Sequence, residues 1–478
     1  MRQYKKYKRC ALIATTILAM VVTVAVAGCA NQQSTAYKWT PITANETDPA
    51  AWNEHYPRQY ESFLLNDEGG QGSSKYKGSD PLDRLSEFPY QLVLFDGFGF
   101  GVEYNEPRGH TMMMKDILDV DASRRKAGGV CLSCKSTYAP ALRDEMGVDY
   151  FKKPFAEVHA KIPEKDQKMG VTCVDCHDPE TIQIRPTRFA FFDTLKLMGK
   201  DPKSFTKQDK RSVVCGQCHV TYVIKKNKEM KSVGLFYPWG ESSWGNITIE
   251  DIESVIKSDP ANLEWTSKIT GIKLGHIRHP EFELFTNNST HWKAGLSCPD
   301  CHMPYERDGS TKFSTHHMQS PLKDDMKACR QCHDQGAAWL RERVITTQDR
   351  TNNAMTRAGN AAAQAAKAIE MANKAPAADQ ALLTKAKDNY EKAYYRVVFI
   401  GAENSMGFHN PTEALRIAGD ALYYAKQSEI LSREALIKAG INPPEKFDLE
   451  LSRYNNRGDK GLKLIQALNK EFTYDGTK

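Results

Sequence analysis

Five Cys-x-x-Cys pairs constrain this chain more than any other feature of its sequence. They account for ten of the 12 cysteines in 478 residues. A histidine follows four of the pairs directly, and a lysine follows the first. The five units are Cys131/Cys134/Lys135, Cys173/Cys176/His177, Cys215/Cys218/His219, Cys298/Cys301/His302 and Cys329/Cys332/His333.

Three kinds of site use such pairs. A disulfide between residues three apart closes a very small loop and contributes little. Paired zinc sites place the second pair about 15–20 residues after the first, whereas most intervals here are longer, and zinc does not need a histidine after each second cysteine. Covalent c-type haem uses the whole unit, because two thioethers fix the macrocycle and the adjacent histidine ligates iron. The sequence therefore predicts five covalently bound c-type haems.

The fold class follows from these motifs. The haems would be large apolar bodies that the chain wraps in loops and short helices, so we predict a mainly α, multihaem cytochrome c fold. Unequal intervals between the motifs exclude a solenoid repeat. We expect an irregular N-terminal arm over residues 29–90, a pentahaem catalytic region over residues 91–335 and a long-helix region over residues 336–478.

The C-terminal region carries helical patterns. Alanine-rich composition without proline, or apolar residues at three- and four-residue spacing, marks residues 336–374, 380–402 and 411–439. Asn410-Pro411 is a typical helix start and Gly440 a typical helix end. These patterns predict long, antiparallel amphipathic helices.

The N-terminus has the pattern of an export signal. Residues 2–9 are basic, residues 11–27 are almost wholly apolar, and Val26-Ala27-Gly28-Cys29 resembles a bacterial lipobox. We expect residues 1–28 to be a lipoprotein-type signal peptide, with lipidated Cys29 holding a periplasmic protein at a membrane surface. Ordinary cleavage after Ala27 and an uncleaved anchor helix are the alternatives.

The charge balance gives no support to nucleic-acid binding. The chain has 65 basic and 59 acidic residues, a formal net charge of +6. Residues 1–28 hold five of the basic residues and no acidic one, so the remainder has 60 against 59, a net charge of +1. A basic nucleic-acid surface is therefore not indicated by composition.

Lys135 breaks the motif at the position of the iron ligand. An amine binds iron only when it is neutral, and its ordinary pKa is about 10.4, so the site must desolvate it or the metal must displace its proton. An amine is a σ-donor without a π system, which leaves the iron's electron density to a π-accepting ligand on the opposite face. The alternative is that Lys135 is a surface residue and that this haem takes a histidine from elsewhere.

One Cys-x-x-Cys-Lys unit followed by four Cys-x-x-Cys-His units in an exported chain of this length resembles the pentahaem cytochrome c nitrite reductases, which form ammonia. The resemblance runs from about Arg108 to His409 and continues into the helical C-terminal part. It implies periplasmic six-electron reduction of nitrite to ammonium at the Lys135 haem, with four bis-histidine haems relaying electrons. It also implies a homodimer through the C-terminal helices. A membrane quinol-oxidising multihaem cytochrome or another periplasmic protein would be the electron donor.

The resemblance also implies the second iron ligands. Nine histidines lie outside the cysteine motifs. The matching positions are His110 for the third haem, His291 for the fifth, His316 (or its neighbour His317) for the second and His409 for the fourth. The Lys135 haem has no matching histidine, so its distal face would be open, as catalysis at a metal requires.

Further positions match the family's distal pocket. They are His279 before Pro280, Tyr222 three residues after His219, and either Arg124 or Arg125. An arginine and a protonatable histidine would attract and orient anionic nitrite. His and Tyr would supply protons and hydrogen bonds, because each departing oxygen must be protonated.

One departure from the family concerns calcium. Many members hold calcium through a glutamate before the active-site tyrosine and a glutamine before the active-site histidine, and here these positions are Thr221 and Arg278. Calcium requires oxygen ligands, and a guanidinium would repel it, so we predict no calcium at this site. Arg278 would supply the positive charge and join the Tyr222 and His279 loops by hydrogen bonds; the alternative is that it points to solvent.

Other functions stay open from the sequence. A multihaem electron conduit would have no substrate of its own, but it would need neither a lysine ligand nor the Arg, Tyr and His set. A reductase of hydroxylamine, nitric oxide or sulfite could use the same fold. The glycine-rich segment Phe95–Gly101 lacks the spacing of a phosphate loop, and we expect its backbone to pack against a haem or another loop.

Overall fold

The computed structural model describes residues 42–43, 46–68, 74–76, 78, 80 and 82–464. The chain divides into two compact units, residues 1–43 and 44–478, and the helices and strands of the described residues all belong to the second. The predicted signal peptide and Cys29 lie outside the described residues. Within the described part, no helix is both long and apolar enough to cross a membrane.

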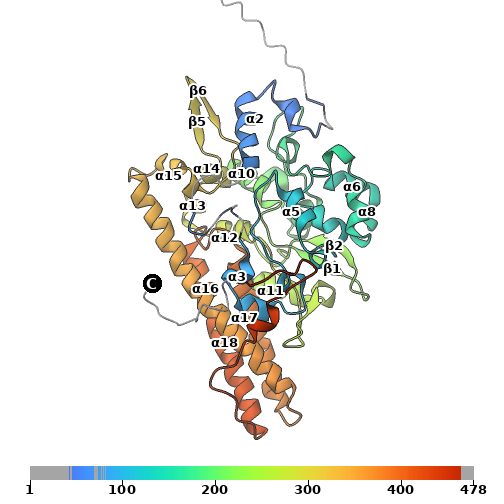
Figure 1. The fold of residues 1–478 in the computed structure, drawn as a ribbon. Coiled ribbons are helices and arrows are strands. Elements are labelled where there is room, and N and C mark those ends of the chain that lie inside the picture. The colour runs from blue at the N-terminus through green and yellow to red at the C-terminus, as the bar shows by residue number, and fades with distance from the viewer. Residues whose placement is uncertain are drawn as a thin grey trace, which may run out of the picture. The chain divides into compact units, whose positions relative to one another are not determined.

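Helices dominate the second unit (Figure 1). The short helices are α2 (Pro57–Leu64), α3 (Arg84–Glu87), α4 (Tyr90–Leu94), α5 (Met113–Asp119), α6 (Ala139–Met146), α7 (Asp149–Lys152), α8 (Phe155–His159), α9 (Phe189–Leu197), α10 (Lys207–Gly216), α11 (Ile249–Ser258), α12 (Glu281–Thr286), α13 (Thr290–Lys293), α14 (Cys298–His302) and α15 (Lys327–Arg330). The long helices are α16 (Ala337–Asn373), α17 (Gln380–Ala402) and α18 (Pro411–Lys438). The predicted mainly α fold with long C-terminal helices is confirmed.

The strands form three antiparallel hairpins among the described residues. β1 (Val223–Lys226) pairs with β2 (Ser232–Phe236), β3 (Trp265–Thr266) with β4 (Lys273–Leu274), and β5 (Tyr305–Asp308) with β6 (Thr311–Ser314). The sequence does not predict these hairpins, because strands of two to five residues are too short to show an alternating pattern. The first hairpin begins directly after Tyr222, so it fixes the position of the main chain at that residue.

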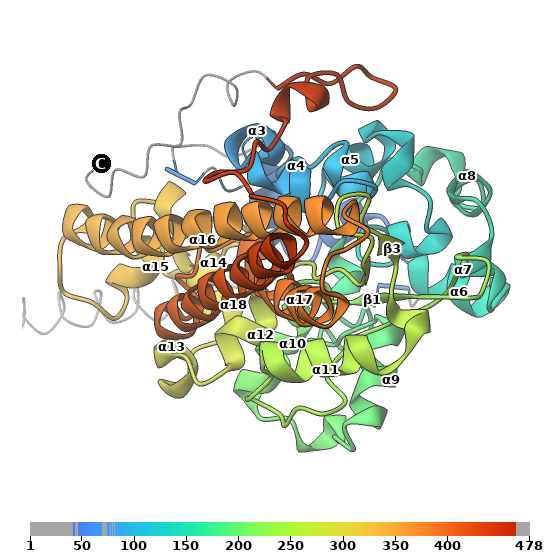
Figure 2. The same ribbon diagram turned by 90° about the horizontal axis from the view of Figure 1, so that it is seen from below.

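The three long helices run side by side in both views (Figures 1 and 2). Ala358, Ala362 and Ala366 of α16 are fully buried, and their four-residue spacing places small side chains on one face of the helix. The side chain of Asn410 accepts a hydrogen bond from the N–H of Glu413 at the start of α18, and Gly440 follows its end with φ of +73°. The predicted bounds agree with the structure to within one residue.

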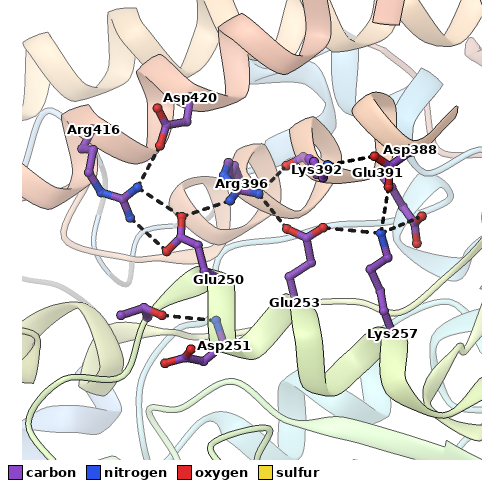
Figure 3. Close-up of polar contacts among 11 residues, drawn as sticks. Glu250, Asp251, Glu253, Lys257, Asp388, Glu391, Lys392, Arg396, Arg416 and Asp420 are labelled. Atoms are coloured by element: carbon purple, nitrogen blue, oxygen red, sulfur yellow. Dashed lines mark hydrogen bonds and ion pairs between the residues drawn. The ribbon is translucent and has the colours of Figure 1, made fainter. Parts of the chain in front are cut away.

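An ion-pair network joins α11 to α17 and α18 (Figure 3). The buried guanidinium of Arg396 lies 2.7 Å from Glu253 and 3.0 Å from Glu250. Arg416 also contacts Glu250, at 3.1 Å. Because a buried charge is costly unless it is paired, this network fixes α11 on the helical pair.

The glycine-rich segment Phe95–Gly101 packs against the end of β3 and against the turn at Ser123. A Cβ on Gly97, which has φ of +102°, would lie 2.9 Å from the carbonyl oxygen of Thr266, and a Cβ on Gly99 would lie 2.8 Å from that of Ser123. The close approach of another loop is therefore as expected. The segment places the rings of Phe98 and Phe100 beside the arginines of the candidate site.

Candidate active site

The cysteine motifs lie on short helical turns. Residues i, i+3 and i+4 share one face of a helix, so the two cysteines and the residue after them point the same way. The N–H groups of His177, His219 and His333 each donate to the carbonyl of the first cysteine of their motif, at 2.9 Å. Lys135 differs, because its N–H donates to Leu132 at 2.8 Å and makes a tighter turn. None of the ten motif cysteines forms a disulfide.

Cys332 of the fifth motif differs from the other motif cysteines in its exposure. It is exposed, whereas the other nine motif cysteines are half-buried. The physical reason is its place in the fold. α15 ends at Arg330 and α16 begins at Ala337, so Cys332 lies in the connection between them, and residues 331–336 are all exposed. Within the described residues, the polypeptide itself therefore does not cover Cys332.

Two motifs carry a helix cap of their own. The N–H of Thr172 donates to Asp175 at 2.8 Å, and the N–H of Ser297 donates to Asp300 at 2.7 Å. Each aspartate also pairs with an arginine at 2.7 Å. In the pattern Ser/Thr-Cys-x-Asp-Cys-His, the first residue and the aspartate form a capping box. This pattern is visible in the sequence, but we did not use it to predict these helical turns.

The motifs also lie against one another. The thiol of Cys134 in the first motif contacts that of Cys218 in the third, and Cys215 of the third contacts Cys298 of the fourth. The side chain of Gln217 donates to the carbonyl of Asp175 in the second motif, at 3.0 Å. The first four motifs therefore form one contiguous cluster.

Four pairs of imidazole rings face each other beside the motifs. The distances between ring centroids are 5.9 Å for His110 and His219, 6.1 Å for His177 and His316, 6.1 Å for His302 and His409, and 6.5 Å for His291 and His333. Each pair combines a motif histidine with a histidine that the family resemblance implies. The ring that faces His177 is that of His316.

This spacing fits one metal ion between each pair of rings. A metal–imidazole bond is about 2 Å long, and adding the distance from nitrogen to ring centre on both sides gives a centroid separation of about 6 Å. The outer nitrogens are also held as in metal-ligating histidines. Nδ1 of His177, His302 and His316 each lies 3.0 Å from a backbone carbonyl oxygen, and Nδ1 of His409 lies 2.5 Å from Glu403. These residues fit the iron of a bis-histidine haem.

The structure separates the two candidate arginines. The Arg124 guanidinium lies 3.6 Å from the centre of the Phe100 ring and donates to the carbonyl of Glu103 at 2.5 Å. Burial lowers its pKa, and Tyr222 and Arg278 are among the groups that act on it. Arg125 instead donates to the carbonyl of Leu118 at 3.2 Å. Arg124 is therefore the arginine that lies between the Phe100 ring and the first cysteine motif, since its carbonyl oxygen is 3.9 Å from Cys131 Sγ.

His279 has an unusual backbone conformation. Its φ of +50° lies in the left-handed region, which is uncommon for residues other than glycine and is often found at functional sites. Burial, followed by the charge of Lys135 and those of nearby arginines, lowers the pKa of His279 to about 3. The ring is therefore neutral at pH 7. The positive charge expected from a protonated histidine is carried by Arg124 and Arg278 instead.

Arg278 is buried and joins the two loops of the pocket. Its guanidinium makes two hydrogen bonds to Glu264, of 2.8 and 2.6 Å, and donates to the carbonyls of His276 at 3.2 Å and Tyr222 at 3.4 Å. Its side chain is 5% exposed, so it does not point to solvent. Glu264 was not identified from the sequence, because it lies 14 residues before Arg278 and outside any motif.

α12 packs against the third cysteine motif. The N–H of Phe282 donates to the carbonyl of His219 at 3.1 Å, and a Cβ on Gly216 would lie 2.3 Å from the Phe282 ring. Glu283 accepts hydrogen bonds from the N–H of Thr221 at 2.9 Å and from the indole of Trp239 at 2.8 Å. The segment that follows His279 is thus held against the segment that precedes Tyr222.

Two buried carboxyl groups follow His279 and were not identified from the sequence, although both lie in His279-Pro280-Glu281-Phe282-Glu283. Glu281 accepts from the side chain of Asn404 at 2.6 Å and lies 4.0 Å from Nδ1 of His279. Burial raises the pKa of both Glu281 and Glu283 to about 8. Both can therefore carry a proton at neutral pH.

Two other histidines serve elsewhere. Nδ1 of His276 lies 3.2 Å from the Tyr394 hydroxyl, and its ring is enclosed by phenylalanines. Nε2 of His159 lies 2.9 Å from the carbonyl of Gln167. These contacts account for both rings without a role at a cysteine motif.

Comparison with known proteins relates the whole chain to one group. The sequence profile of the cytochrome c552 family matches residues 48–473. Cytochrome c nitrite reductase subunit NrfA of Nitratidesulfovibrio vulgaris is 32% identical, over 91% of this chain and 88% of the relative. Cytochrome c-552 of Parabacteroides distasonis is 31% identical, over 84% of this chain and 80% of the relative.

A solved structure is also similar. It is the catalytic subunit (NrfA) of the cytochrome c nitrite reductase of Desulfovibrio desulfuricans, described as having two calcium sites. The TM-score is 0.76 at 31% identity, covering 83% of this chain and 88% of that chain.

Proposed function

This chain belongs to the cytochrome c552 family, whose members carry covalent c-type haems, and from that membership we propose that it reduces nitrite to ammonium at a lysine-ligated haem. The observation that carries the proposal is the group of residues beside the one cysteine motif without a histidine. Cys131 Sγ of that motif lies 3.9 Å from the carbonyl oxygen of Arg124, whose guanidinium lies 3.6 Å from the centre of the Phe100 ring. Arg278, which directly precedes His279, has its guanidinium 5.7 Å from the same ring and 4.9 Å from the centre of the Tyr222 ring.

The cysteine pairs would attach five haems. Four of them would have two histidine ligands each and would relay electrons, because a saturated iron cannot bind substrate. The ring separations near 6 Å support the pairs His110/His219, His177/His316, His302/His409 and His291/His333. Contacts between the first, third and fourth motifs support a continuous electron path to the Lys135 haem.

The exposed position of Cys332 is compatible with haem attachment. A thioether needs an accessible thiol and no burial of its own, and the preceding Cys329 is half-buried. The fifth haem would then be the one most open to solvent at its motif. An exposed haem edge at this end of the relay suits the entry of electrons from a donor protein.

At Lys135, a bound haem iron would supply electrons and an open position for nitrite. The residues around it have separate roles. Arg124 and Arg278 make the pocket attractive to an anion. Burial raises the pKa of Tyr222, so its hydroxyl keeps its proton and donates a hydrogen bond. Neutral His279 can donate a hydrogen bond from one ring nitrogen and accept one at the other. A proton taken up at one nitrogen while another leaves from the second would pass through the ring to a departing nitrite oxygen.

We test this function with reduced viologen as donor, measuring ammonium formed from nitrite. His279→Asn should lower the rate by about 10²-fold or more, as expected for loss of a side chain that takes part in proton transfer. His159→Asn, which changes a histidine outside the pocket, should leave the rate near that of the wild type. Normal ammonium output from His279→Asn would refute the assignment of His279 to the site of nitrite reduction. If the wild type itself does not reduce nitrite, the alternative function, an electron conduit, is favoured. Rates with hydroxylamine, nitric oxide and sulfite decide between nitrite and the alternative substrates.

We also propose that Arg278 takes the place of calcium. The support is its buried position, its contacts with the carbonyls of Tyr222 and His276, and its pairing with Glu264. A cation at that position would repel a calcium ion. The expected result is full activity after treatment with a chelator, with no stoichiometric calcium by metal analysis. Loss of activity on chelation would contradict the proposal.

The setting of the enzyme is part of the proposal. The protein would be exported and held at a membrane surface through Cys29, with a quinol-oxidising multihaem cytochrome or another periplasmic protein as donor. A homodimer through the long helices is supported by four exposed apolar side chains on α18, which are Leu415, Tyr423, Ile430 and Ile437.

A further inference from the structure

Glu283 is a buried carboxyl group without a cation beside it. Its side chain is fully buried, and Oε1 accepts both of its hydrogen bonds while Oε2 is buried without a partner. Among the described residues it forms no ion pair. The neighbouring carboxyl group of Glu281 adds to the effect of burial, because its negative charge disfavours the ionised form of Glu283. An ionised carboxylate there would be unpaired in the interior, which is strongly unfavourable.

The hydrogen bonds of Glu283 connect the two halves of the pocket. Glu283 lies on the first turn of α12, which begins two residues after His279. Its Oε1 accepts from the N–H of Thr221, directly before Tyr222, at 2.9 Å. A displacement of Glu283 Oε1 would therefore move the Tyr222 backbone relative to His279.

The remaining contacts between these segments do not duplicate this one. The N–H of Arg278 donates to the hydroxyl of Thr221 at 3.2 Å, and the N–H of Phe282 donates to His219 at 3.1 Å. Both bonds use main-chain donors of residues 278–283. A third contact, from the Arg278 guanidinium to the carbonyl of Tyr222, is longer, at 3.4 Å. Glu283 alone among these contacts holds the main chain at Thr221 through a side-chain oxygen. Trp239 donates to the same oxygen at 2.8 Å, so Glu283 Oε1 has a second donor that is not part of either segment of the pocket.

Resting on the proposed function, we propose that Glu283 is a positioning residue, which acts as a neutral hydrogen-bond acceptor and fixes Tyr222 against His279 for nitrite binding. The requirement is an oxygen at the right place, and the negative charge is not needed. The chemistry of the side chain then predicts an unusual order of variants. An amide of the same length should replace Glu283 better than a shorter carboxylic acid.

The experiment compares Glu283→Gln, Glu283→Asp and, as control, Trp239→Phe in the haem-loaded protein. Glu283→Gln keeps the acceptor and should bind nitrite within about twofold of the wild type. Glu283→Asp keeps the acid but withdraws the oxygen by one methylene, and misplacement on this scale should lower kcat/KM by up to about 10²-fold. Trp239→Phe removes the second donor but leaves the bond from Thr221, so its nitrite affinity should stay near that of the wild type.

Nitrite affinity is measured from the absorbance change of the oxidised protein, alongside kcat, KM, haem content and Tm. The inference is overturned if Glu283→Asp matches the wild type, or if Glu283→Gln weakens nitrite binding tenfold while Glu283→Asp does not. If Glu283→Asp fails to retain haem, Glu283→Gln decides alone, and a tenfold loss of affinity in it counts against the inference. Absence of nitrite reduction in the wild type would instead refute the proposed function.

Discussion

Neighbouring residues in this sequence can have quite different surroundings. Arg124 lies against the Phe100 ring beside the pocket, whereas Arg125 bonds to the carbonyl of Leu118. The sequence could not choose between them, because both follow the same short turn and the choice depends on a distant aromatic segment. Glu264 and Glu283 could not be found for a similar reason, since their importance comes from partners that only the fold brings near.

The two arginines give a direct test of the pocket. Arg124→Gln should raise the KM for nitrite by about tenfold or more, because the pocket loses one of its positive charges and a hydrogen-bond donor. Arg125→Gln should change the KM little. Steady-state kinetics of both variants, normalised to haem content, provides the measurement, and the opposite order of effects would place Arg125 in the pocket.

Glu283 should also affect the pH dependence of stability. Its pKa is about 8 in the folded protein and near 4.3 when exposed. Between these values the folded protein binds more protons, so this group's contribution to the free energy of unfolding falls by at most about 1.4 kcal/mol per pH unit as pH rises. Below the pKa of the exposed group, the contribution of Glu283 to the free energy of unfolding is fully present. Above the pKa of the folded protein, this contribution does not decrease further.

The side chain of Gln in Glu283→Gln cannot titrate. The Tm of this variant minus that of the wild type should therefore increase from pH 5 to pH 8. Calorimetry at several pH values measures this difference. A difference in Tm that stays constant across the range would show that Glu283 is already ionised in the folded protein.

At the scale of elements, local signals were sufficient for the long helices and insufficient for the hairpins. The bounds of α18 follow from Asn410, Pro411 and Gly440, whose capping roles are local. The three hairpins have too few residues for a pattern, and their positions are set by the segments they pack against. The docking of α12 on the third motif depends on a close approach at Gly216 that no pattern in the sequence marks.

The network on α11 predicts a large effect from one substitution. Arg396→Met should lower the free energy of unfolding by about 3 kcal/mol, because it removes the buried guanidinium that pairs with Glu253 and leaves Glu253 only the longer contact with Lys257, at 3.6 Å. Lys438→Met removes an ion pair whose lysine side chain is 52% exposed and should cost no more than about 1 kcal/mol. Denaturant unfolding of both haem-loaded variants gives the comparison, and equal effects would mean that the Arg396 network adds no net stability.

At the scale of the whole molecule, the sequence motifs and the family resemblance anticipated the fold class and the histidines that the structure pairs. The rings meet although most of their residues are far apart in sequence, and no local pattern could show which would face which. The resemblance supplied that information, and the ring distances are an independent geometric support for it. The exposure of Cys332 could not be predicted, because its motif reads like the other three that end in histidine. Lipidation of Cys29 and the identity of the donor depend on parts or partners outside the described residues and stay predictions.

The exposed stripe on α18 predicts the oligomeric state. Ile430→Glu combined with Ile437→Glu should convert a dimer into monomers, because two charges would replace apolar side chains at a buried contact. Leu197→Glu, which changes an exposed leucine on α9, should leave the dimer intact. Sedimentation velocity separates the species, and a double variant that remains dimeric would place the interface elsewhere.

The spacing of the paired rings along the chain has a consequence for how the protein matures. Partners are 109 residues apart for His110 and His219, 139 for His177 and His316, and 107 for His302 and His409. On the proposed ligation, a cofactor attached at Cys298 and Cys301 during export would wait for more than a hundred further residues before its second ligand emerges. Biogenesis would pass through half-ligated irons that external ligands can reach, and a polypeptide truncated before residue 409 would remain in that state.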